Sequence, residues 1–86
     1  MPASYSLRIK RSAEKELQRV PKNDLRRIVQ RIKELASDPR PIGCEKLFGE
    51  EGYRVRQGDY RILYTVDDKC RAVEIYKVGH RREVYR

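Results

Sequence analysis

The last third of the chain alternates apolar and cationic residues at the two-residue period of a β-strand. Between Gly52 and Tyr64, tyrosines and aliphatic residues recur at alternate positions, and Arg54, Arg56 and Arg61 lie between them. Successive side chains of a strand point to opposite faces of its sheet, so this pattern buries one face and leaves guanidinium groups on the other. The segment therefore predicts a sheet with one apolar and one cationic face.

Turn-forming residues divide this region into three strands. The runs 53–57 and 60–66 are joined by Gly58-Asp59, a pair that is typical of a tight hairpin turn. A third run, 71–78, follows the polar turn Asp67-Asp68-Lys69. We expect an antiparallel three-stranded meander in this part of the chain.

The register of the hairpin decides which side chains gather on the exposed face. A register that buries Tyr60 places Arg61 on the face that holds Arg54 and Arg56. Gly79 then ends the third strand and releases a cationic segment. The candidate residues of that segment are His80, Arg81 and Arg82, with Tyr85 near the end of the chain.

The first half of the chain predicts a short strand and two helices. Residues 5–9 alternate like a strand, and Ser12 is a candidate N-cap for a first helix. That helix stops at Pro21, and Asn23 is a candidate N-cap for the second. Apolar residues recur at helical spacing in both: Ala13, Leu17 and Val20, then Leu25, Ile28, Val29, Ile32, Leu35 and Ala36. Together with the meander they predict one α+β domain over residues 1–86, with the helical pair on one face of the sheet.

Composition limits the functions open to so small a domain. The chain has 86 residues, with 21 Lys and Arg against 13 Asp and Glu, and a net charge of +8. This balance favours an anionic partner, either nucleic acid or an acidic protein. The apolar runs are too short to span a membrane, and we interpret Cys44 and Cys70 as reduced thiols of a cytoplasmic protein.

Most catalytic and metal-binding patterns are missing from the sequence. It has no Cys/His metal spacing, no phosphate-binding glycine loop and no paired acidic site, so we expect neither a metal nor another cofactor. Taken singly, each arginine is as well explained by the ordinary polar face of a sheet, and Tyr85 by packing at the sheet end. Taken together, neighbouring arginines repel one another and cost stability unless an anion binds them.

The order of these motifs resembles the RelE family of toxins from type II toxin–antitoxin systems, within the RelE/ParE superfamily. The resemblance covers essentially the whole chain and is most specific in Tyr53-Arg54-Val55-Arg56, in 60–64 and in 78–85. It implies the RelE/ParE-like microbial RNase fold and a ribosome-dependent endoribonuclease that cuts messenger RNA in the decoding site without a metal. Its implied partners are the ribosome, through ribosomal RNA, and messenger RNA. It also implies a RelB-type antitoxin that covers the basic surface, with operator DNA bound only through that antitoxin.

The resemblance also implies roles for single residues. The 2′-hydroxyl of the RNA would attack the adjacent phosphate, with Arg61 stabilising its charge, Arg81 assisting the leaving oxygen and Tyr85 orienting or deprotonating the hydroxyl. The RNA-binding candidates are Arg54, Arg56, His80 and Arg82. Arg54 and Arg56 stand where well-known members carry lysines, and because an arginine keeps its proton, we infer that both bind phosphate and neither is the general base. We expect Tyr85 to dominate proton transfer and His80 to contribute modestly.

Three other functions share parts of this pattern. A ParE-like inhibitor of DNA gyrase has the same fold without a nuclease site, and a non-enzymatic basic module would bind nucleic acid with no role for Tyr85. A degenerate toxin would use the sheet face only to bind its antitoxin and regulate its operator. The combination of Arg61, Arg81 and Tyr85 favours the nuclease, because a gyrase-binding protein has no chemical need for it.

Overall fold

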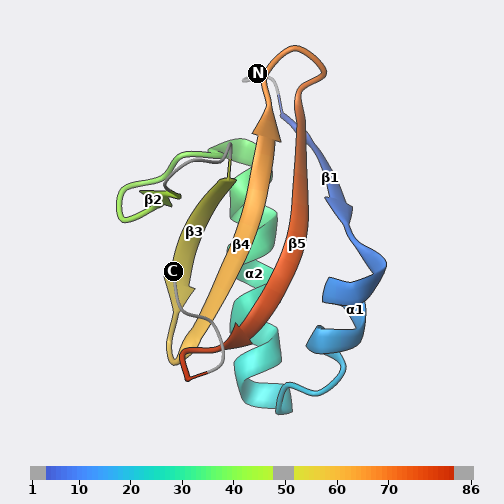
Figure 1. Ribbon diagram of the computed structural model, residues 1–86, viewed down its shortest axis with the longest axis vertical. Helices are drawn as coiled ribbons and strands as arrows, with labels where there is room; N and C mark the ends of the chain where they lie inside the picture. Colours follow the sequence, from blue (N-terminus) through green and yellow to red (C-terminus); the bar gives the residue numbers. More distant parts are fainter. Residues whose placement is uncertain (1–3, 48–51, 83–86) are drawn as a thin grey trace.

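The computed structural model describes residues 4–47 and 52–82, which form two helices and a five-stranded sheet (Figure 1). In chain order these elements are β1 (Ser6–Ile9), α1 (Arg11–Leu17), α2 (Lys22–Ser37), β2 (Glu45–Lys46), β3 (Gly52–Gln57), β4 (Tyr60–Asp67) and β5 (Ala72–His80). The predicted α+β class, with a first strand, a helical pair and an antiparallel meander, is confirmed.

Strands from both halves of the chain meet in the sheet, whose order is β1-β5-β4-β3-β2. The meander of β3, β4 and β5 is antiparallel, whereas β1 pairs parallel to β5, with Ser6 opposite Ala72. At the other edge, β2 pairs its two residues with Tyr53 and Arg54. The sequence indicated the first strand but not its parallel partner, and it did not indicate β2, because two residues are too few to show a period.

Both helices begin before the predicted caps, so the assignment of Ser12 and Asn23 as N-caps was wrong. α1 follows Lys10 and α2 follows Pro21, and neither of these residues makes a capping hydrogen bond through its side chain. Their carbonyl oxygens accept the first intrahelical hydrogen bonds, at 2.9 and 2.8 Å, which places Lys10 and Pro21 at the N-cap positions. Pro21 suits this position because it has no N–H to satisfy and its backbone is already extended before the helix.

A single core fills the space between the helices and the sheet. Its largest fully buried side chain is Tyr64 of β4, whose hydroxyl donates a hydrogen bond to the Pro39 carbonyl oxygen at 2.7 Å. Its other members come from both helices and the meander: Ala13, Leu17, Ile28, Ile32, Leu35, Val55, Ile62, Val73, Ile75 and Val78. Tyr60 and Val66 pack partly buried against it, which confirms the predicted buried face of β4.

α1 continues the edge of the sheet where β1 ends. The Lys10 N–H donates to the Ile75 carbonyl oxygen at 2.8 Å, and Glu16 Oε1 accepts the N–H of buried Val78 at 2.8 Å. The Nζ of Lys77 lies 3.6 Å from the second oxygen of the same carboxylate. Glu16 thus replaces a strand partner and keeps the last part of β5 hydrogen-bonded.

Candidate functional site

Three arginines of the meander share the sheet face that the core does not use. Arg56 of β3 lies directly opposite Arg61 of β4, and Arg54 lies opposite Leu63 on the same side. Val55, between the two arginines of β3, is buried in the core, so the arginines point away from it. In Figure 1 this is the face of the sheet opposite α2. Like charges on directly opposite strand positions destabilise a sheet, so this arginine face, Arg54, Arg56 and Arg61, is suited to an anion.

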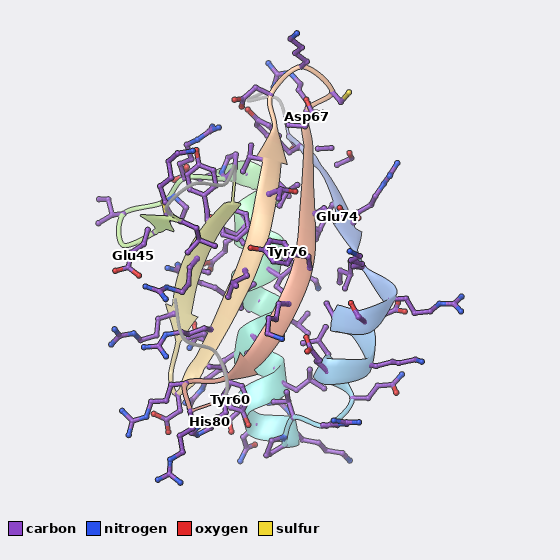
Figure 2. The ribbon with its side chains drawn as sticks, viewed as in Figure 1. Glu45, Tyr60, Asp67, Glu74, Tyr76 and His80 are labelled. Carbon is purple, nitrogen blue, oxygen red and sulfur yellow. The ribbon has the colours of Figure 1, made fainter. Side chains whose placement is uncertain are left out.

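A carboxylate lies at the edge of the arginine face, and the sequence analysis missed it. β2 places Glu45 at the edge of the sheet (Figure 2), opposite Arg54 of β3. The Nε of Arg54 donates a hydrogen bond to Glu45 Oε1 at 2.9 Å. This hydrogen bond, with the nearby charges of Arg54, Arg56 and Arg61, lowers the pKa of Glu45 below its usual range. Glu45 is therefore ionised at neutral pH, and any anion that binds Arg54 has to compete with it. No periodic signal marked this residue, because it follows an irregular loop.

Hydrogen bonds to backbone carbonyl oxygens bring the Arg61 side chain close to the backbone of Arg81. Arg61 Nη1 donates a hydrogen bond to the Arg81 carbonyl oxygen at 3.1 Å. The Arg81 N–H in turn donates to the Asp59 carbonyl oxygen at 2.7 Å, and the Arg81 Nε lies 3.9 Å from Asp59 Oδ1. Gly58, with a φ of +61°, precedes Asp59 in the tight turn between β3 and β4. The β3–β4 hairpin therefore holds the start of the C-terminal segment beside Arg61.

His80 lies on the other side of the sheet from the arginine face. Its ring contacts Tyr60 edge to face, with ring centroids 5.5 Å apart, and the pair sits at one end of the sheet (Figure 2). With Glu16, Arg19, Val20 and Val78, these two rings line a cavity of about 190 Å³. His80 Nδ1 accepts the backbone N–H of the exposed Arg82 at 3.2 Å. This placement sets His80 apart from the arginine face, and its expected roles in proton transfer and in RNA binding stay predictions.

A β-bulge explains the position of His80. Leu63 pairs with Lys77 and Tyr64 with Ile75, which leaves Tyr76 as an extra residue in β5. One extra residue reverses the alternation of the strand, so Val78 and His80 continue the buried side instead of the exposed one. The ring of Tyr76 lies across the sheet (Figure 2), and a Cβ added at Gly52 would stand 3.0 Å from its hydroxyl.

Tyr85, the predicted proton-transfer residue, lies outside the described residues. Within 4–47 and 52–82, no group of three His, Cys, Asp or Glu side chains is arranged to hold a metal ion. No helix of the described chain is long and apolar enough to cross a membrane. Cys44 and Cys70 are both free thiols.

Charged side chains also gather at the opposite end of the sheet. They surround a hollow of about 730 Å³ whose lining includes Arg40, Tyr53 and Asp68. Arg40 donates to both carboxylate oxygens of Asp68, at 3.2 and 2.9 Å, and to the Tyr53 hydroxyl at 2.9 Å. Tyr5 also donates to Asp68, at 2.7 Å, and these hydrogen bonds lower the pKa of the Asp68 carboxyl. We interpret this network as a structural link between the hairpin β4–β5 and the loop after α2.

Solved structures of RelE toxins share this arrangement of helices and strands. The archaeal RelE–RelB complex of Pyrococcus horikoshii matches with a TM-score of 0.83 and 32% sequence identity, over 94% of this chain and 99% of that chain. The isolated Escherichia coli RelE toxin matches with a TM-score of 0.79 and 25% identity, over 90% of this chain and 84% of that chain. The fold is therefore that of the RelE toxins.

Sequence comparison agrees with this fold. The family model described as ParE toxin of type II toxin–antitoxin system, parDE, matches residues 7–85. Toxin RelG of Mycobacterium tuberculosis is 31% identical over 86 residues, which covers 95% of this chain and 97% of that relative. The chain belongs to the ParE toxin family and is a type II toxin of the RelE/ParE superfamily, so the resemblance in the sequence is confirmed.

Proposed function

We propose that this toxin is a ribosome-dependent endoribonuclease that cuts messenger RNA in the decoding site. The observation that carries the proposal is the arginine face, where Arg56 and Arg61 lie directly opposite each other and Arg61 also contacts Arg81. The guanidinium groups of Arg56 and Arg61 suit the binding and neutralisation of a phosphodiester, because a guanidinium fork matches two phosphate oxygens in a bidentate manner. The similarity to RelE toxins, which extends over nearly the whole chain, supports the same conclusion.

In the proposed reaction the RNA supplies its own nucleophile. The 2′-oxygen forms a bond to phosphorus, the bond from phosphorus to the 5′-oxygen breaks, and the products are a 2′,3′-cyclic phosphate and a 5′-hydroxyl. Arg61 stabilises the charge on the phosphate in the transition state, and Arg81 donates to the departing 5′-oxygen. Tyr85, as its phenolate, takes the proton of the 2′-hydroxyl, and Arg81 supplies the proton that turns the departing 5′-oxygen into a hydroxyl. Arg54, Arg56 and Arg82 hold the RNA backbone.

The partner of this toxin is, in the same proposal, a RelB-type antitoxin in the cytoplasm. The related P. horikoshii and E. coli toxins were solved in complexes with RelB antitoxins. The net charge of +8 and the arginine face suit a partner that brings acidic side chains. Operator DNA would be bound through the antitoxin.

Toeprinting of messenger RNA on programmed ribosomes tests the nuclease. We expect cuts within the decoding site with the wild-type protein, and loss of most cutting with Tyr85→Phe, which keeps the ring but removes the proton acceptor. A message that stays intact with wild-type toxin would refute the nuclease. Cutting by Tyr85→Phe at the wild-type rate would refute the role of Tyr85 alone.

A second candidate is inhibition of DNA gyrase. It is favoured by the match to a family model named for ParE toxins. It requires no RNA chemistry at Arg61 and Arg81. An intact message, together with trapped cleavage complexes of gyrase on plasmid DNA, would establish this alternative.

A further inference from the structure

Three hydrogen bonds hold the turn that follows β5, and they surround Arg81. The Arg81 N–H donates to the Asp59 carbonyl oxygen at 2.7 Å, and the Arg81 carbonyl oxygen accepts from Arg61 Nη1 at 3.1 Å. The next N–H, that of Arg82, donates to Nδ1 of the His80 ring at 3.2 Å. The backbone on both sides of Arg81 is therefore held, although its side chain is 61% exposed.

The His80 ring is fixed from the core side of the sheet. It contacts Tyr60 edge to face, with ring centroids 5.5 Å apart, and it lines a cavity of about 190 Å³ together with Val78 of β5 and Glu16 of α1. An Nδ1 that accepts a hydrogen bond carries no proton, so the neutral ring has its proton on Nε2. The packing of the ring thus presents a fixed acceptor to the Arg82 N–H.

The turn sets the course of the residues that the proposed reaction needs. Arg81 lies within it, and Tyr85 follows Arg82 by three residues. Fixing a residue in one backbone conformation costs entropy, and a segment that is ordered before the RNA binds has already lost that entropy. The hydrogen bond from Arg82 to His80 restricts the segment at the point where it leaves the sheet. A ring on the core side can in this way affect chemistry on the arginine face.

We propose that His80 is a positioning residue for the nuclease. Its ring accepts the Arg82 N–H and so keeps Arg81 in place beside Arg61 before RNA binds. This inference rests on the proposed function, in which Arg81 serves the departing 5′-oxygen. It requires no proton transfer by His80, because the ring acts through the backbone from the side of the sheet opposite the arginine face.

Two substitutions separate the hydrogen bond from the packing of the ring. His80→Asn removes the ring but keeps an acceptor, because an asparagine oxygen accepts the N–H of the second residue after it in an Asx-turn. His80→Phe keeps an aromatic ring against Tyr60 and has no acceptor. The control is Arg19→Gln, an exposed change beside the same cavity that leaves the acceptor in place. Thermal unfolding establishes that each variant is folded.

Hydrogen exchange of the Arg82 amide, measured by NMR, tests the hydrogen bond without any RNA. A hydrogen bond of this kind changes the ratio of closed to open turn by about 2- to 10-fold. We therefore expect the Arg82 N–H to exchange faster in His80→Phe by about that factor, and close to the wild-type rate in His80→Asn and Arg19→Gln. Equal exchange rates in wild type and His80→Phe would overturn the proposal at its first step.

Single-turnover cleavage of ribosome-bound message tests the catalytic consequence. At saturating ribosomes we expect His80→Phe to cut about 10-fold more slowly than wild type, because a small displacement of Arg81 misaligns it with the leaving oxygen. The ribosome concentration that gives half-saturation should change little, and His80→Asn should recover most of the rate. A His80→Asn rate as low as that of His80→Phe would overturn the positioning role.

The failure of this inference is distinguishable from the failure of the proposed function. If wild type never cuts the message, the proposed function is refuted whatever the amide exchange shows. If wild type and His80→Phe cut at the same rate, only the role of His80 is refuted.

Discussion

Removal of the Glu16 carboxylate should destabilise the protein through the edge of β5. The Val78 N–H lies 2.8 Å from Glu16 Oε1, and Val78 is only 2% exposed, so Glu16→Ala leaves a buried donor without its partner. An unsatisfied buried donor costs about 1–3 kcal/mol. In a domain of this length, each kcal/mol lowers the melting temperature by about 4–8 °C. We therefore expect Glu16→Ala to lower it by about 4–24 °C.

Two further variants separate the hydrogen bond from the charge of Glu16. Glu16→Gln keeps an acceptor oxygen and loses only the partly exposed ion pair with Lys77, so it should cost less than about 1 kcal/mol. Glu14→Ala, an exposed change in the same helix, is the control. Thermal and urea unfolding followed by circular dichroism measure all three variants. Equal losses in Glu16→Ala and Glu16→Gln would refute the reasoning, because the Val78 donor would then not depend on this acceptor.

Three other predictions follow from single contacts. Arg61→Gln should slow single-turnover cleavage on saturating ribosomes by about 100-fold or more, whereas Arg56→Gln should mainly weaken the binding of RNA. An equal loss of cleavage rate in both variants would contradict the assigned roles. The pKa of the Asp68 carboxyl is lowered in the folded protein, so its pairing stabilises the fold at pH values above those at which carboxyl groups ordinarily titrate. This contribution is lost as pH falls through the folded-state pKa. Asp68→Asn should therefore lose less stability than wild type between pH 7 and pH 3 in urea titrations, and parallel losses would exclude the linkage. Gly52→Ala should lower the free energy of unfolding by about 1 kcal/mol, because the new Cβ crowds the Tyr76 hydroxyl. Adding Tyr76→Phe should restore much of this loss, and a double-mutant cycle that finds no coupling between the two changes would disprove it.

The alternation of apolar and cationic residues in the sequence was enough to predict which residues form the arginine face. Arg54 and Arg56 alternate with Val55, and this two-residue period needs no partner strand to show which side is apolar. The Gly58-Asp59 turn then fixed the register that sets Arg61 beside Arg56. The helical stripes were equally local, although they did not reveal that Lys10 and Pro21, rather than Ser12 and Asn23, are the N-cap residues.

Contacts between distant segments decided the rest of the site. Glu45 reaches Arg54 only because β2 pairs with β3, and Glu16 supports β5 only because α1 packs at the sheet edge. His80 is the clearest case, because the extra residue in β5 moves it away from Arg61 to the side of the core. A sequence pattern carries the alternation of one strand, but a bulge arises from how two strands fit together, so the tertiary structure alone could place His80.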